Sequence, residues 1–244
     1  MISLETRSFC VQCQKQHGLP MGHAYKYAEE LQKQLETHQR IDFENEMANA
    51  CFSTDYLFGV ARGQMFGVLE CEDEQGAIVI LKAFSCQYNS KWLLDGWAPP
   101  LLDVEKYTEL TRRADLEIKR LGRAIDEADL DEQVSLKQAR KEISQKLMKK
   151  IHGLYELHNF RQQTSSLQEA FYLPKGMPTG TGDCCAPKLL NWAAQKNLRP
   201  IGLAEFYWGR ENRSQTRKHG EFYSSCESRC QPILGFMLCG REEL

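Results

Sequence analysis

The sequence predicts a mixed α/β fold with a helical hairpin inserted in it, and three patterns indicate this. Residues 164–244 alternate between helical and strand-like segments, as an α/β layer does. Within Met65–Phe84, two runs of aromatic and aliphatic residues flank the turn sequence Asp73–Gly76, which predicts a β-hairpin. Residues 104–163 lack proline and carry apolar residues at helical spacing, which predicts two antiparallel helices with a coiled-coil-like seam.

The composition is that of an ordinary globular protein, with 244 residues, 42% hydrophobic and 26% charged. A formal net charge of −2 gives no bulk attraction to polyanions, so any nucleic-acid binding must come from a local patch. The N-terminal residues resemble no signal peptide, and no apolar run approaches the roughly 20 residues of a membrane span. We therefore expect a cytoplasmic protein without a membrane partner, in which the clustered cysteines among the ten serve metal binding or catalysis more readily than disulfides. Four isolated cysteines in apolar surroundings are expected to pack in the core: Cys51, Cys71, Cys86 and Cys239.

The patterns divide the chain into four parts. An N-terminal helical segment covers 1–40, the β-hairpin part of the core 41–102, the inserted helical hairpin 103–163, and a cysteine-bearing α/β part 164–244. The bend of the inserted hairpin is expected within Asp126–Glu132. The other predicted elements are a strand-like run at Tyr56–Ala61, a strand at Ile201–Trp208, and helices at Ala24–Thr37, Ser166–Phe171, Ala186–Lys196 and from Cys230 to about Leu238.

Basic side chains gather on one face of the second inserted helix. This face is either simply solvated or a strip that docks RNA phosphates. Its residues are Lys137, Arg140, Lys141, Lys146, Lys149 and Lys150.

Two adjacent cysteines, Cys184 and Cys185, are the first candidates for chemistry. They follow a glycine-rich stretch that ends in Asp183, a good N-cap, and Pro187 suits a first helical turn. The pair is therefore predicted at a helix N-terminus, where exposed amides and the helix dipole favour a thiolate.

A second pair, Cys226 and Cys230, is predicted at another helix start. Together with Cys184 it provides three thiolates, which suit zinc with an open fourth position for water, the pattern of a catalytic site. One alternative is a closed site in which Cys185 or His219 adds the fourth ligand. The other is free cysteines without metal.

The order of these elements resembles the cytidine-deaminase-like fold, especially its bacterial toxin-type branch. The resemblance rests on Asp183–Leu189, on Cys226 and Cys230, and on Ala83–Ser85 at the end of the predicted β-hairpin. It implies a three-layer sandwich in which the helical hairpin is an insertion, and a zinc-dependent nucleobase deaminase.

This resemblance has one departure. The deaminase motif places its proton-carrying glutamate two residues after the first zinc ligand, where this chain has Ala186. Asp183 and Glu205 are the candidates to replace that carboxylate.

Over nearly its whole length the chain also resembles the uncharacterised N-terminal region that precedes the catalytic domain in some long RluA-type RNA pseudouridine synthases. This implies an RNA-modification context, with RNA or nucleotides as substrate or a pseudouridine synthase as partner. The catalytic Arg-Leu-Asp tripeptide of those synthases does not occur here, so a non-catalytic accessory module is the alternative to a deaminase. The matching stretches are His23–Gln32, Gly63–Leu69, Ala83–Ser85, Pro99-Pro100, Gly182–Leu190, Leu203–Gly209, Arg217–Gly220 and Cys226–Leu234.

A basic loop with aromatic neighbours is the candidate nucleic-acid interface. Arg213, Arg217 and Lys218 provide phosphate contacts, and Trp208 and Tyr223 provide rings on which bases stack. The alternative is a solvated loop over core aromatics.

Two further candidates involve histidine. His219 would carry protons near the cysteines, and paired with Cys184 or Cys185 it would make a thiol-dependent hydrolase. Near the N-terminus, zinc-ligand residue types occur within a short span whose spacing matches no standard zinc finger: Cys10, Cys13, His17 and His23.

Overall fold

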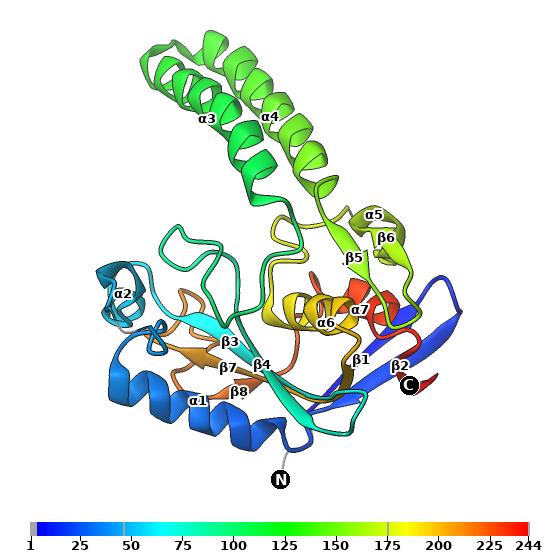
Figure 1. Ribbon diagram of the computed structural model, residues 1–244. Coiled ribbons are helices and arrows are strands. Elements are labelled where there is room, and N and C mark those ends of the chain that lie inside the picture. The colour runs from blue at the N-terminus through cyan, green and yellow to red at the C-terminus, as the bar shows by residue number, and fades with distance from the viewer. Residues whose placement is uncertain (1–3, 46, 175, 244) are drawn as a thin grey trace. The chain divides into compact units, whose positions relative to one another are not determined.

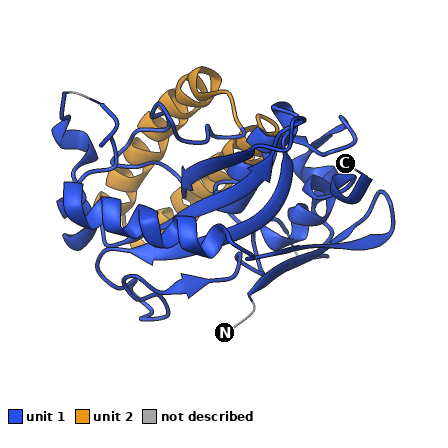
Figure 2. Ribbon diagram, turned by 60° about the horizontal axis from the view of Figure 1, so that its bottom comes forward, with its two compact units in different colours: residues 1–101, 157–244 blue, residues 102–156 orange. Residues whose placement is uncertain are grey.

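The computed structural model describes residues 4–45, 47–174 and 176–243 of the chain. The chain divides into two compact units, of which the first joins residues 1–101 to 157–244 and the second covers 102–156 (Figure 2). The first unit holds the four-stranded sheet and the candidate catalytic, metal-binding and nucleic-acid residues named above, except the basic face of residues 137–150, which belongs to the second unit. The second is a pair of helices.

An antiparallel four-stranded sheet with the order β4-β3-β7-β8 forms the centre of the first unit (Figure 1). β3 and β4 form the predicted hairpin, and β7 pairs with the other edge of β3 so that Phe66 lies opposite Phe206 and Gly67 opposite Glu205. The strands are β3 (Gln64–Glu72), β4 (Ile78–Phe84), β7 (Arg199–Trp208) and β8 (Phe222–Tyr223).

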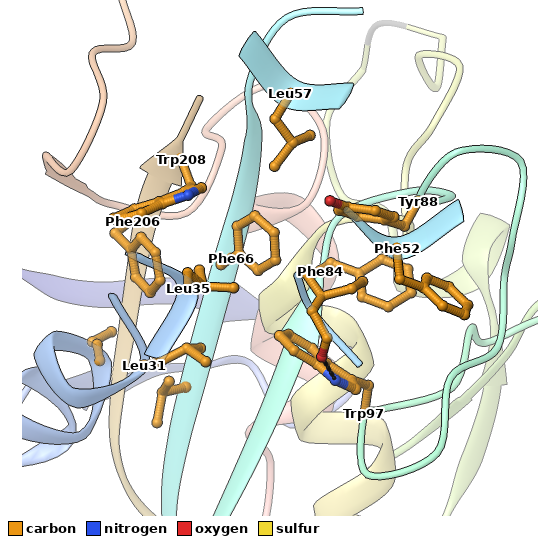
Figure 3. Close-up of a cluster of buried hydrophobic side chains, with 14 of the residues drawn as sticks. Leu31, Leu35, Phe52, Leu57, Phe66, Phe84, Tyr88, Trp97, Phe206 and Trp208 are labelled. Atoms are coloured by element: carbon orange, nitrogen blue, oxygen red, sulfur yellow. Dashed lines mark hydrogen bonds between the residues drawn. The ribbon is translucent and has the colours of Figure 1, made fainter. Parts of the chain in front are cut away.

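Helices cover both faces of this sheet, because successive residues of a strand point to opposite sides. Phe66 faces α1 (Ala24–His38), where an aromatic core fills the space (Figure 3). Gly67 faces α6 (Cys185–Gln195), and a Cβ on this glycine would lie 2.6 Å from the Cys185 Cβ. Glycine is thus needed at position 67 for α6 to approach the sheet.

The prediction of a mixed α/β fold is confirmed, with antiparallel sheets. The finer prediction of a deaminase-like sandwich stays a prediction. The strand expected at Tyr56–Ala61 is wrong, because Asp55–Phe58 forms the short helix α2. One helical turn directs Leu57 into the core and leaves Phe58 and Val60 exposed, which a strand paired in the sheet would not do.

The sequence did not indicate the antiparallel hairpin of β1 (Glu5–Cys10) and β2 (Lys15–Pro20) that precedes α1. The C-terminal helix α7 (Gln231–Met237) packs on β1, and a Cβ on Gly235 would lie 2.1 Å from the Phe9 carbonyl oxygen. The Gln231 side chain donates a hydrogen bond of 2.8 Å to the Arg7 carbonyl. This contact brings the end of the chain to the N-terminal hairpin.

The remaining elements of the first unit are short. They are β5 (Glu156–His158), β6 (Thr164–Ser166), α5 (Leu167–Ala170) and 3-10 turns at Ala50–Phe52 and Arg241–Glu243.

The second unit consists of α3 (Val104–Glu127) and α4 (Leu130–His152), which pack against each other. Asp103 and Asp129 cap the two helices, and each carboxylate accepts hydrogen bonds from two backbone amides of the first turn. The break between the helices lies inside the predicted bend. No helix in the described part of the chain combines the length and the apolar character needed to cross a membrane.

Replacing Gly235 by alanine tests the contact between α7 and β1. The added Cβ would meet the backbone of Phe9, which cannot move without disturbing β1. We therefore expect the free energy of unfolding to fall by about 1–3 kcal/mol. Gly176→Ala is the control, because nothing lies within 4 Å of the added Cβ. Urea unfolding followed by tryptophan fluorescence measures both, and equal stability of Gly235→Ala and wild type would contradict the contact.

Candidate metal centre

The turn between β1 and β2 brings two cysteines and a histidine together. Cys10 ends β1, Cys13 lies in the turn, and His17 lies on β2. The Gln14 amide donates to the Cys10 carbonyl at 2.9 Å, and Gln14 itself has a left-handed φ of 58°, which tightens the turn. The Cys13 sulfur consequently lies 3.0 Å from His17 Nε2.

Cys239 completes this group from the other end of the chain. It follows α7, is almost fully buried, and its carbonyl accepts a hydrogen bond of 3.0 Å from the Phe160 amide. Ligand atoms of Cys10, Cys13, His17 and Cys239 all lie within 4.8 Å of one another. In the ranges that the structure describes, this is the one group of three or more His, Cys, Asp or Glu side chains so close together. We name it the cysteine–histidine cluster.

The electrostatics of the cluster depend on its burial. Burial opposes ionisation of Cys13, but hydrogen bonds from Cys239 and Cys10 outweigh it and lower the Cys13 pKa below its usual value. Burial, and then the contact with Cys13, raises the pKa of Cys239 to about 12. Burial lowers the pKa of His17, which keeps the imidazole in the neutral form that binds metals. Positive charge is supplied nearby by Arg161, which also pairs with Glu243.

The donor set of three sulfurs and one imidazole nitrogen suits a soft or borderline divalent ion. The cluster contains the predicted Cys10, Cys13 and His17 but not His23, whose side chain is 76% exposed and whose Nδ1 lies 4.0 Å from Glu70 Oε1. Cys239 takes its place. No spacing pattern could reveal this residue, because it is reached only through the packing of α7 on β1.

The structure brings together two of the three predicted zinc ligands, Cys184 and Cys230. Cys184 is the N-cap of α6 and Cys230 that of α7, and the two thiols are hydrogen-bonded. This contact, together with burial, raises the pKa of Cys184 well above its usual value. The helix N-terminus therefore does not give a thiolate here, because burial and neighbouring groups outweigh the helix dipole.

Cys226 does not join this pair at ligand distances among the described residues. It is half-buried, its sulfur lies 3.7 Å from Ser228 Oγ, and its carbonyl accepts hydrogen bonds from the amides of Cys230 and Gln231. The alternative ligand Cys185 is fully buried on the sheet, where its thiol donates to the Met65 carbonyl at 3.3 Å. Burial raises the pKa of Cys185 well above its usual value.

Glu205 lies beside the start of α6. Its Oε1 accepts a hydrogen bond of 3.2 Å from the Ala186 amide, and its Oε2 accepts one of 2.6 Å from Ser225 Oγ. Because the side chain is only 5% exposed, burial raises the pKa of this carboxyl group. Asp183 was predicted as the N-cap of α6, but Cys184 occupies that position, and the Asp183 carbonyl accepts a hydrogen bond from the Cys86 amide at 2.6 Å.

Lys188 is a residue of this region that the sequence did not indicate. Its side chain is fully buried, and Nζ donates to the carbonyls of Phe84 at 2.9 Å and Cys86 at 2.7 Å. Burial lowers its pKa. In the sequence, Lys188 cannot be distinguished from a solvent-exposed lysine of the helix. Only the tertiary contacts show that its ammonium group links α6 to the end of β4.

The predicted nucleic-acid residues separate into exposed and buried ones. The Arg217 guanidinium lies 4.3 Å from the centre of the Tyr223 ring, and Arg213 and Lys218 are exposed. Trp208, in contrast, is buried in the core on the α1 face and is not open to a base.

His219 does not pair with the cysteines. Its ring lies 4.2 Å from that of Trp208, and its Nδ1 accepts a hydrogen bond of 3.1 Å from the Gly209 amide. Trp208 belongs to the core on the α1 face, whereas Cys185 lies on the α6 face of the sheet. The structure therefore does not assemble the predicted pair of a thiol and His219.

The raised pKa of Glu205 predicts a pH-dependent stability difference between wild type and Glu205→Gln. The folded state binds the Glu205 proton more tightly than the unfolded chain, whose pKa is near 4.5. The stabilisation is complete below that value and is lost as pH rises through the folded pKa, so wild type should lose stability relative to Glu205→Gln over this range. Urea unfolding across pH measures it, with exposed Glu74→Gln as control. Parallel profiles for wild type and Glu205→Gln would contradict the burial effect.

Comparison of the chain with protein-family models, with curated proteins and with solved structures gave no match in any of the three. The deaminase-like and synthase-associated resemblances therefore stay predictions.

Proposed function

We propose that this protein is a zinc-binding protein and that Cys10, Cys13, His17 and Cys239 hold a structural zinc ion. The convergence of these four ligand atoms within 4.8 Å supports the proposal. Three thiolates and one imidazole are a common donor set of structural zinc sites, which are tetrahedral and closed. Zinc–sulfur bonds of about 2.3 Å place the sulfurs of a tetrahedral site about 3.8 Å apart, a spacing inside the 4.8 Å that bounds the distances among the four ligand atoms.

Zinc at this position would tie the two ends of the chain together. Three ligands come from the β1–β2 hairpin and the fourth, Cys239, lies two residues after α7, the helix that packs on β1 through Gly235. A metal that binds only the folded state stabilises it by its binding free energy, and here that state needs both distant segments in place. The ion would therefore act on stability, because a site with four protein ligands leaves no position for substrate.

In the RNA-modification context that the sequence resemblance implies, we propose a zinc-stabilised accessory module that contacts RNA. The stacked Arg217 and Tyr223, with exposed Arg213 and Lys218 beside them, support this role. An arginine held over an aromatic ring keeps its guanidinium edge available to phosphate oxygens. A pseudouridine synthase is the alternative partner of such a module.

A second candidate function, nucleobase deamination, is supported by the hydrogen bond from the Ala186 amide to Glu205. Position 186 is where the deaminase motif would carry its glutamate, so the Glu205 carboxylate lies beside the residue that lacks one. A raised pKa suits a group that must carry a proton near neutral pH. Glu205 also lines a small cavity of about 10 Å³, which has room for about one water molecule.

The metal ligands fit this second candidate less well. Cys184 and Cys230 provide two thiols in contact, and the predicted third ligand, Cys226, is not within ligand distance of them in the described ranges. The three-thiolate set of a catalytic zinc site is thus not assembled, and the cysteine–histidine cluster remains the better metal centre.

Metal analysis of the purified protein tests the structural zinc. We expect one zinc per chain, and its loss with a lower melting temperature in Cys13→Ser, because three ligands hold the ion less tightly than four. A chelator should lower the melting temperature of wild type in the same way. Cys51→Ser, which changes a half-buried cysteine outside the cluster, is the control. Zinc retained in Cys13→Ser but lost in Cys184→Ser would place the ion at the other cysteines and contradict the proposal.

Ammonia release from cytosine or adenine, supplied in RNA, DNA and free nucleotides, separates the two candidates. If the protein is a deaminase, Glu205→Gln should lower the rate by about 10²–10⁴-fold at unchanged zinc content, the usual contribution of a positioned general acid or base. Turnover unaffected by Glu205→Gln would remove its catalytic role. Zinc without ammonia release, together with RNA binding that weakens in Arg217→Ala, would support the accessory module.

A further inference from the structure

The exposed segment that follows α2 lies against the loop between β7 and β8. The Arg210 amide donates a hydrogen bond of 3.0 Å to the Leu57 carbonyl, and the Gly63 amide donates one of 2.8 Å to the Arg210 carbonyl. Residues 58–62 and 209–221 therefore meet in one continuous surface. We name it the two-loop surface.

Gly209 determines how closely the two loops approach each other. Its φ is 111°, and a Cβ there would lie 2.6 Å from the Leu57 carbonyl oxygen and 2.7 Å from Gly63 Cα. Arg62 Nη1 also donates a hydrogen bond of 2.6 Å to the Glu211 carbonyl. The two loops thus pack backbone to backbone, and this contact fixes the positions of their side chains relative to each other.

The two-loop surface is rich in positive charge, although the formal net charge of the chain is −2. Its two segments contain five cations and only two acids. One of these acids, Glu221, accepts a hydrogen bond of 2.9 Å from the Tyr223 hydroxyl. In the ranges that the structure describes, none of the five cations forms an ion pair, so the surface attracts a polyanion. The cations are Arg62, Arg210, Arg213, Arg217 and Lys218.

Phe58 is an exposed aromatic side chain on this surface. It is 47% exposed, and Val60 beside it is 96% exposed. The Phe58 ring lies 5.3 Å from the His219 ring, edge-on at 63°, so His219 covers at most one of its faces. His219 is itself held by the Trp208 ring at 4.2 Å and by the Gly209 amide. Phe58 is therefore supported from below and open to solvent.

We infer that the two-loop surface binds single-stranded RNA and that a base stacks on Phe58. This rests on the proposed RNA contact through Arg217 and specifies the form of RNA that is bound. The bases of a duplex stack on each other, whereas unpaired bases are free to stack on an aromatic ring. The cations would hold the phosphates while the ring holds a base, the combination by which proteins bind single strands.

An exposed phenylalanine beside an exposed valine also fits a protein partner. The cores of protein interfaces, however, are depleted of charged side chains. Here Lys218 directly precedes His219, and Arg62 follows Val60 by two residues, so each segment supplies a cation near the apolar side chains. This charge favours a phosphate chain with free bases over an apolar protein surface.

Fluorescence anisotropy with a labelled oligouridine of about 12 nucleotides, which stays unpaired, tests the inference. We expect wild type to bind it more tightly than an RNA duplex of the same length. Phe58→Ala should weaken binding by about 5–150-fold at an unchanged melting temperature, the usual contribution of one stacked base. Its affinity should depend on salt as that of wild type does, because stacking releases no counterions. Arg217→Ala should lower both the affinity and its salt dependence.

Two further variants separate stacking from apolar contact. Phe58→Trp keeps a ring and should bind like wild type, with additional quenching of tryptophan fluorescence when a base stacks on it. Phe58→Leu keeps an apolar side chain without a ring and should bind as weakly as Phe58→Ala. The control is Leu93→Ala, which removes a 58% exposed apolar side chain outside the two-loop surface and should bind like wild type.

RNA binding that weakens in Arg217→Ala but not in Phe58→Ala would overturn the inference and leave the proposed RNA contact in place. A duplex bound as tightly as the oligouridine would do the same. No binding to either RNA would overturn both. Wild type that self-associates through Phe58, with RNA binding unchanged in Phe58→Ala, would identify a protein-docking surface and also overturn the inference.

Discussion

The burial of both faces of β3 and β7 is the constraint on which the first unit depends. Phe66 and Phe206 face the aromatic core under α1, while Gly67 and Glu205 face α6. Because side chains alternate along a strand, the same pairing register that stacks the aromatic rings also places Glu205 at the start of α6. A slip of one residue would exchange the two faces and separate the carboxylate from the cysteines.

The same close approach of backbones organises the cysteine–histidine cluster. Gly235 lets α7 lie directly on β1. Because Cys239 follows α7 closely, this packing places its thiol beside Cys10 and Cys13. The cluster thus depends on the position of α7, and α7 can take this position only because residue 235 has no Cβ. A metal bound to Cys239 would in turn hold α7 in place. Packing and metal binding would stabilise the same contact between the two ends of the chain.

The surroundings of the two cysteine-rich regions affect the thiol pKa values differently. The hydrogen bond with Cys230 and then burial raise the pKa of Cys184, and burial and then Glu205 raise the pKa of Cys185, so both thiols are neutral. In the cysteine–histidine cluster, Cys13 is only partly buried and receives hydrogen bonds that lower its pKa, with Arg161 nearby. The helix N-terminus that drew attention to Cys184 therefore matters less than the degree of burial, because desolvation opposes any thiolate in an apolar site.

The sequence by itself determined the elements whose signals are local. Apolar spacing located α1, α6, β7 and both hairpin helices, and the Asp73–Gly76 turn located the β3–β4 hairpin. Only the tertiary structure decided which of these surfaces meet. Cys239 joins Cys10, His219 lies on the other face of the sheet from Cys185, and Lys188 is buried, because each depends on contacts between residues far apart in the chain. The spacing of residues along the chain does not predict such contacts, because they depend on which face of the sheet each helix packs against.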